Sequence, residues 1–489
     1  MRCAWLLTMI MAIPASAAER PYRDYVRSSL DVLVAHGMDR YGEIHAPIFV
    51  SILDVSTREC PRNPAALDEA WRVTRRDRRN PAGANLLTDQ PLIDVLHRMT
   101  QRTGDSKYAE AADACIRYYL DHLVDEKGFL WWGWHRHYDV FTDKMTGHSG
   151  NHHEIHAISD IRWDRLWAVN REATRKEIEA CWRWHVIDKE TGQVNRHGDG
   201  RRGCDFAMSA ASFIDAFTFL HEKTQDEVWL ERARLLEAYY HQRRNPDTDL
   251  FPDRPNAGAD RFDGAAFVTS ITGCYCRGLM NAWARSGAER FRDHAADYLL
   301  AYDRYAYDAN TGTYYGALRL DGTVIPGPRT VGDYAQYEPR GHLDLWEPYV
   351  AGYQYALYTA EAFARAYDLT RRPELLTAAE RFAAWLDRTP PGTVETEKTW
   401  YSPYTNGPGK QGTYAGKYGR AIFLYLKLHE LTDKPAYLAR ARQMADTAID
   451  KLYVNRLFKG HPAKPYYEAM DGVGFLLQAL LALDECRDD

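Results

Sequence analysis

The residues that could do chemistry are concentrated in two short stretches of the first half of the chain. The segment 147–158, GHSGNHHEIHAI, holds four histidines, an asparagine and a glutamate, and the segment 131–139, WWGWHRHYD, adds tryptophans and two more histidines. Imidazole, amide and carboxylate groups accept protons, neutralise anions and bind metals. This composition predicts a metal site, an acid–base centre or a sugar-binding cleft.

A metal site would start from His153 and His156, which a helical turn would place on one face beside Glu154. Zinc sites need three or four fixed ligands, and the HExxH spacing of zinc proteases is absent. Further histidines are available nearby, namely His135, His137 and His148. Because a polar pocket floor with packed histidines gives the same pattern, we expect no cofactor, with a divalent metal as the alternative.

Paired carboxylates would support a different reaction. A glycoside hydrolase needs two of them, one protonated and one ionised, beside the scissile bond. Acidic residues at helix starts are also common caps, so the pattern is not specific. The candidates are Asp139, Glu154, Asp205, Asp263, Glu347 and Asp471, and spacing singles out no pair among them.

β-Elimination from a uronate is the reaction that we favour. It needs donors that neutralise the uronate carboxylate, a base for the C5 proton and an acid for the leaving oxygen. Asn151 and Arg196 are the expected neutralisers, and His152 or His197 is the expected base. Tyrosines in the later polar loops would supply the acid.

The string SGNHHE resembles the Asn–His pair of the helical-toroid polysaccharide lyases, the alginate-lyase and heparinase-like group. In that group the Asn helps to neutralise the carboxylate, and the His acts as base or supports it. The resemblance therefore assigns these roles to Asn151 and His152, and it assigns Arg196 by position to the arginine of the alginate-lyase type. Gly150 stands where that type has a second Asn, and no Tyr follows Arg196 at the expected distance, which leaves the acid open.

Flat aromatic rings match the C–H faces of pyranoses, and the chain carries 14 Trp and 32 Tyr. We expect most of these rings to lie in the core and those beside polar loops to line a sugar cleft. The expected substrate-binding residues are Trp131, Trp132, Trp134, His153, Tyr334, Tyr337, Trp346, Tyr401 and Tyr404.

A repeated helical hairpin is expected to position these residues. Charged segments with apolar residues at i, i+3, i+4 and i+7 alternate with segments that are apolar on nearly every side, which is typical of outer and inner helices. The alternation predicts an all-α fold, an (α/α)6 or (α/α)7 toroid with long rim loops, which the helix at 23–36 could close. The polar loops precede the inner helices, so we expect them to meet on one rim.

The start of the chain predicts export. Residues 1–17 combine a charged start, an apolar run and an Ala-Ser-Ala cleavage site, leaving a single toroid domain over 18–489. A net charge of -6 gives no footprint for nucleic acid, and no later apolar stretch is long enough to span a membrane. We expect a secreted or periplasmic protein.

Three functions follow, all with an anionic polysaccharide or oligosaccharide as partner. The first is an exported polysaccharide lyase that cleaves a glucuronan, alginate or pectate-like polymer by β-elimination. The second is a glycoside hydrolase on the same toroid. The third is a non-catalytic glycan-binding protein, which the many ionisable groups of the rim disfavour.

Overall fold

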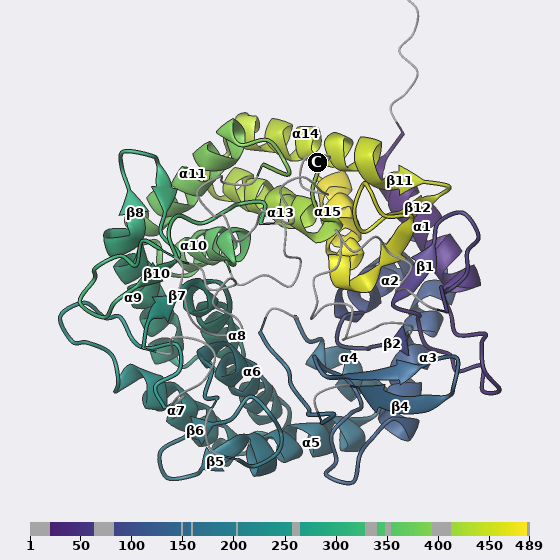
Figure 1. The fold of residues 1–489 in the computed structure, drawn as a ribbon, viewed down its shortest axis with the longest axis horizontal. Helices are drawn as coiled ribbons and strands as arrows, with labels where there is room; N and C mark the ends of the chain where they lie inside the picture. The colour runs from purple at the N-terminus through teal and green to yellow at the C-terminus, as the bar shows by residue number, and fades with distance from the viewer. Residues whose placement is uncertain are drawn as a thin grey trace, which may run out of the picture.

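The chain folds into a closed ring of helices in two layers, which confirms the predicted all-α toroid (Figure 1). The computed structural model describes residues 20–62, 83–147, 150–157, 160–201, 204–256, 265–327, 340–347, 354–393 and 412–486. The predicted signal segment 1–17 lies outside the described residues.

Inner and outer helices alternate along the described chain. The inner layer consists of α2 (Gln90–Thr103), α4 (Trp163–Val169), α6 (Ala207–Thr224), α8 (Cys276–Ser286), α10 (Ala356–Thr370), α13 (Ala415–Thr432) and α15 (Val473–Glu485). The outer layer consists of α1 (Tyr22–His36), α3 (Lys107–His122), α5 (Arg171–Ala180), α7 (Glu227–His241), α9 (Glu289–Ala306), α11 (Pro373–Arg388) and α14 (Pro435–Leu452).

The two layers differ in burial as their sequences predict. Every residue of α6 from Ala207 to His221 is buried, and small residues let this helix approach α8 closely. A Cβ at Gly278 of α8 would lie 2.6 Å from the Cβ of Ala211 of α6. The outer helix α7 buries only one side and begins at Asp226, whose carboxylate accepts the backbone N–H of Val228 at 3.1 Å.

The two ends of the described chain close the ring, with α1 beside α15 in Figure 1. The Tyr22 hydroxyl donates to Asp446 of α14 at 2.8 Å, and Arg23 of α1 pairs with Asp484 of α15 at 3.6 Å. The N-terminal helix therefore takes the outer place that its amphipathic pattern predicted.

The strands are short and connect helices. The pairs are β1 (Ile52–Asp54) with β13 (Tyr466–Glu468), β5 (Val186–Asp188) with β6 (Gln193–Val194), β7 (Phe267–Val268) with β10 (Ala317–Leu318), β8 (Tyr307–Asp308) with β9 (Thr313–Tyr314), and β11 (Tyr453–Val454) with β12 (Leu457–Phe458). A three-stranded sheet joins β2 (Gly83–Ala84), β3 (Arg136–Asp139) and β4 (Lys144–Gly147). Among the described helices, none has the length and apolar character needed to cross a membrane.

Candidate active site and metal centre

A tight bend before β3 brings His135 beside Glu154. Gly133 makes this bend possible with a φ of 116°, because a side chain there would lie 2.6 Å from the backbone oxygen of Glu154. The same oxygen accepts the backbone N–H of Trp134 at 3.0 Å. Asn85 holds the bend from the other side by donating its amide to the backbone oxygen of Gly133 at 2.7 Å.

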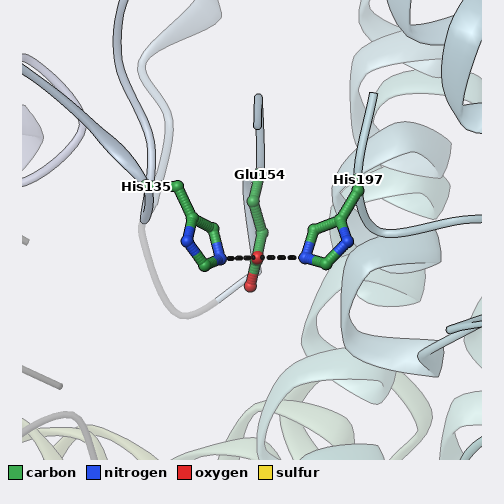
Figure 2. Close-up of side chains that lie close together, drawn as sticks. All are labelled: His135, Glu154 and His197. Atoms are coloured by element: carbon green, nitrogen blue, oxygen red, sulfur yellow. Dashed lines mark ion pairs between the residues drawn. The ribbon is translucent and has the colours of Figure 1, made fainter. Parts of the chain in front are cut away.

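Glu154 lies at the centre of a cluster of cationic and imidazole groups. Its Oε2 is 2.5 Å from Nε2 of His135 and 3.0 Å from Nε2 of His197, and Figure 2 shows the two rings approaching the carboxylate from opposite sides. Its Oε1 is 2.5 Å from Nε2 of His156. Arg196 adds a guanidinium, with Nε 3.8 Å from Oε2.

The carboxylate of Glu154 is ionised in this environment. Burial alone would raise the pKa of Glu154, since the residue is 2% exposed. The positive charge of Arg196 and the imidazoles of His135 and His156 outweigh burial and hold the pKa of Glu154 well below its usual range. The cluster therefore presents a permanent negative charge to whatever binds between the two rings.

Arg196 and His197 come from the loop that follows β6 and precedes α6. Asn195 shapes this loop, because its Oδ1 accepts the backbone N–H of His197 at 2.8 Å and its Nδ2 donates to the backbone oxygen of Arg201 at 2.7 Å. The guanidinium of Arg196 lies 4.5 Å above the ring of Phe206.

His135, Glu154 and His197 can hold a divalent metal. Each offers one ligand atom, and these atoms lie within 4.8 Å of one another. Nε of Arg196 lies 3.2 Å from Nε2 of His197 and 3.8 Å from Oε2 of Glu154, so a guanidinium borders the same three side chains. Two imidazoles with one carboxylate form a common site for first-row divalent metals.

His152 and Asn151 border this centre. The ring of His152 stacks on that of His197 with centroids 4.7 Å apart, and the two form a second possible metal-binding group with Asp199. Burial and His197 lower the pKa of His152, so its ring is neutral at neutral pH. Asn151 is exposed in the left-handed region with φ 54°, and its backbone oxygen accepts Nε of Arg136 at 2.8 Å.

Burial corrects three of the expected substrate-binding residues. Trp132 is fully buried, and its indole N–H points at Glu177 and His153. His153 is 1% exposed and points into the same interior, away from Glu154. Trp346 is 1% exposed and donates its N–H to a backbone oxygen. None of the three offers a ring face to a sugar.

The remaining expected residues divide into two groups. Trp131 is half-buried beside the site, with the guanidinium of Arg136 4.4 Å from its ring, and Trp134 is 6% exposed and lies against His156. The four tyrosines expected on the later rim lie outside the described residues: Tyr334, Tyr337, Tyr401 and Tyr404.

Sequence reasoning missed how His135 and Glu154 combine. Both were candidates, His135 as an extra ligand and Glu154 as a hydrolase carboxylate, but the proposed helical pair His153 and His156 does not converge on one point. The signal that could have found the site is the pair of histidines at 135 and 137 in an alternating strand, followed by a glutamate after a tight Gly-containing loop.

Comparison with known proteins bears on this part of the chain. Residues 65–208 match the family model described as periplasmic pectate lyase, and this stretch contains all the site residues from His135 to His197. A pectate disaccharide-lyase from Dickeya dadantii (strain 3937) is 31% identical over 130 residues. That match covers 25% of this chain and 23% of the relative, so the chain spans under a quarter of the relative's length.

Solved structures with similar arrangements of helices cover nearly the whole chain. A D-mannose isomerase matches at 11% identity and a TM-score of 0.49 over 95% of this chain and 97% of its own. The cellobiose 2-epimerase of Bacillus thermoamylovorans B4167 matches at 10% identity and a TM-score of 0.48, over 94% of this chain and 98% of its own. The α-1,6-mannanase of Salegentibacter sp. HEL1_6 matches at 10% identity and a TM-score of 0.46, over 94% of this chain and 99% of its own. These likenesses concern the arrangement of helices and not the reaction.

The chain folds as an (α/α) toroid, and the segment 65–208, which carries the candidate site, is similar to periplasmic pectate lyases.

Proposed function

We propose that the protein is an exported polysaccharide lyase that cleaves a pectate-like polyuronate by β-elimination. The observation that carries the proposal is the position of the Arg196 guanidinium and of the candidate metal ligands His135, Glu154 and His197 beside the imidazole of His152. The match of residues 65–208 to periplasmic pectate lyases supports pectate as the substrate and the periplasm as the location.

The reaction follows from this arrangement. A base removes the proton at C5 of a uronate, the electron pair of that C–H bond forms the C4–C5 double bond, and the C4–O bond to the next sugar breaks. The leaving oxygen takes a proton, so no water is consumed. Negative charge builds on the C6 carboxylate as the proton leaves, and donors aimed at that carboxylate stabilise the transition state.

Each residue of the cluster has a role in this proposal. Arg196 is permanently charged and neutralises the uronate carboxylate, with Asn151 as a second donor. A divalent metal at the three-residue centre, when bound, would draw electron density from that carboxylate as a Lewis acid. Nε2 of His197 is already directed at Glu154, whereas His152 makes no hydrogen bond within the described part of the chain, which favours His152 as the base.

The sugar platform in this proposal is Trp131, which is half-buried next to Arg136, whereas Trp134 is buried. The orientation of the Trp131 ring is fixed by its indole N–H, which donates to the backbone oxygens of His137 at 3.1 Å and Thr146 at 2.9 Å. A fixed indole beside a cationic centre suits a sugar acid, since the ring face packs on C–H groups while the carboxylate meets the cations.

An absorbance assay tests the proposal. The protein is incubated with polygalacturonate, alginate or glucuronan, each with and without a chelator, and the ultraviolet band of unsaturated uronates is followed. We expect the band with polygalacturonate, its loss with chelator and its return on adding a divalent metal. Growth of the band with no effect of chelator would remove the metal from the proposal, and no band with any polymer would contradict elimination.

A glycoside hydrolase remains a second candidate because two of its predicted carboxylates share one pocket. Glu347 and Asp471 both line a pocket at the starts of α10, α13 and α15. Asp471 pairs with Lys464 at 2.8 Å, and Glu347 lies 3.6 Å from Lys417. Saturated products that disappear in Glu347→Gln and persist in Arg196→Ala would favour this candidate over the lyase.

A further inference from the structure

A row of buried polar groups lies directly behind the candidate site and has no part in the chemistry proposed above. Its members are Glu177 on α5, His153 beside Glu154, and His185 at the end of the π-helical turn Cys181–His185. Their exposures are 0%, 1% and 0%. Polar groups this deeply buried cost free energy unless each donor meets an acceptor.

The groups form a continuous chain of short contacts. Oε1 of Glu177 is 2.9 Å from Nε2 of His153. Nδ1 of His153 is 2.8 Å from Nε2 of His185. Nδ1 of His185 is 2.8 Å from the backbone oxygen of Asn195. This row of contacts therefore runs from α5 to Asn195, the first residue of the loop that carries Arg196 and His197.

The last acceptor fixes the proton positions along the chain. A backbone oxygen only accepts, so Nδ1 of His185 carries a proton and donates to Asn195. Nε2 of a neutral His185 then accepts from Nδ1 of His153, which leaves Nε2 of His153 as a lone pair. The indole N–H of Trp132 points at the same two atoms, 3.1 Å from Nε2 of His153 and 2.9 Å from Oε1 of Glu177. A proton on the carboxyl group of Glu177 makes the direct contact of Oε1 with that lone pair attractive as well.

The surroundings of each group favour this neutral arrangement over an ion pair. Burial raises the pKa of Glu177 to about 8, and burial lowers the pKa of His185 well below the usual range. Oε2 of Glu177 accepts the backbone N–H of Leu130 at 2.7 Å, so the carboxyl group is fixed at both oxygens. The ring of Phe129 stacks on His153 at 4.1 Å and keeps water out.

The two histidines of this row also contact the loop 195–198 through their backbone atoms. The backbone N–H of Asn195 donates to the backbone oxygen of His185 at 2.7 Å, and that of Gly198 donates to the backbone oxygen of His153 at 3.0 Å. Residues 195–198 are thus held at both ends by the two histidines of the chain. Rotation of the His185 ring would break its hydrogen bond to the backbone oxygen of Asn195, the residue that precedes Arg196.

We propose that Glu177, as a protonated carboxylic acid, is a positioning residue that acts through His153 and His185 to hold Arg196 and His197 in place. This role rests on the proposed function only for its effect on catalysis. Its effects on proton positions and on metal affinity do not depend on which reaction the enzyme performs.

Neutron diffraction on the wild-type protein tests the proton positions directly. We expect deuterium on the carboxyl group of Glu177, on Nδ1 of His153 and on Nδ1 of His185. Deuterium on Nε2 of His153 with a bare carboxylate at Glu177 would show an ion pair and would overturn the proposal.

Variants test the positioning role, with Zn²⁺ affinity measured by calorimetry and kcat and KM measured on polygalacturonate. Glu177→Gln keeps a donor toward His153, so we expect its Zn²⁺ affinity to stay within about threefold of wild type. Glu177→Leu removes that donor, so we expect it to weaken Zn²⁺ affinity roughly tenfold and to lower kcat more than it raises KM. Glu179 lies on the same helix and pairs with Arg175 at 2.7 Å, so Glu179→Gln is the matched control.

Wild-type Zn²⁺ affinity and kcat in Glu177→Leu, with only a lower melting temperature, would overturn the positioning role. Absence of lyase activity in every variant and in wild type would instead contradict the proposed reaction, while the Zn²⁺ affinities and the neutron structure would still decide the role of Glu177. If Glu177→Leu does not fold, a loss of Zn²⁺ affinity in Glu177→Gln as large as tenfold would also contradict the proposal.

Discussion

Adjacent residues of the histidine-rich loop point to different sides of the backbone, and this decides their roles. His152 stacks on His197 beside the site, while His153 enters the interior toward Glu177. The sequence shows the residue types and their density but not these directions, because the loop has no regular period. The cluster of titratable groups was therefore predictable, whereas the choice of Glu154 as its centre was not.

Arg196 is the first residue to test at this scale. We expect Arg196→Ala to lower kcat by about 10²–10³ with the fold intact, because a donor to the developing negative charge is lost. Arg196→Lys should recover only part of the rate, since lysine cannot reproduce the fixed guanidinium plane. Arg201→Ala is the control, because Arg201 lies in the same loop with its side chain 81% exposed. Equal rates in Arg196→Ala and Arg201→Ala would exclude Arg196 from the reaction.

Asn151 needs a variant that separates its amide from its backbone. Its φ of 54° is strained for alanine, so Asn151→Ala would change the loop as well as the side chain. Asn151→Gly keeps the backbone and removes the amide, and we expect it to lower kcat by about 10²–10³ if the amide neutralises the uronate carboxylate. A rate close to wild type in Asn151→Gly, with a lower rate in Asn151→Ala, would assign the residue a structural role.

At the scale of elements, the helices were predictable and the small sheet beside the site was not. Hydrophobic period and buried, Gly- and Ala-rich segments identify inner helices such as α6. Asp226 caps α7, whereas Asp433 has φ 56° and ends α13. The sheet β2–β3–β4 escaped prediction because its strands are short and β2 pairs with a strand some fifty residues away.

Close packing between inner helices gives a prediction at this scale. Gly278 of α8 faces Ala211 of α6, and a new Cβ would lie 2.6 Å from that of Ala211 and 3.0 Å from its backbone oxygen. We expect Gly278→Ala to destabilise the protein by about 1–3 kcal/mol, because neither helix backbone can yield easily. Gly327→Ala is the control in urea unfolding, because no atom of the described residues lies within 4 Å of the new Cβ. Equal midpoints for the two variants would contradict this packing.

At the scale of the whole molecule, an ionic network joins helices across the inside of the ring. Asp160, just before α4, pairs with Arg277 of α8 at 2.6 Å and with Arg420 of α13 at 3.4 Å. Arg420 also pairs with Glu361 of α10 at 3.0 Å. The alternation of helices predicted a ring, but it could not identify these residues, because their contacts are separated by up to 260 positions.

Asp160 makes the ring sensitive to acid. Burial would raise its pKa, but Arg277 and Arg420 outweigh burial and lower the pKa of Asp160 to about 2. Since the folded pKa lies below the unfolded value, the carboxylate stabilises the fold above about pH 4 and loses this effect as pH falls through about 2. We expect Asp160→Asn to lower the melting temperature near neutral pH, with the difference from wild type shrinking toward about pH 2.

The side chain of Asp160 keeps 40% exposure to the ring interior, so solvent screens part of this effect. Asp164→Asn is the control, because Asp164 is similarly exposed at 44% and pairs with the neighbouring Arg162 and Arg165. A melting temperature difference between wild type and Asp160→Asn that is the same at both pH values would contradict the assigned pKa.

Elimination and hydrolysis differ by one molecule of water, which mass spectrometry measures directly. A defined trigalacturonide is digested with the wild-type protein in the presence of a divalent metal, and the masses of the two products are summed. Elimination predicts that the sum equals the mass of the substrate, with the loss of water visible on the fragment that carries the new double bond. A sum larger by one water would contradict the lyase and shift attention to Glu347 and Asp471.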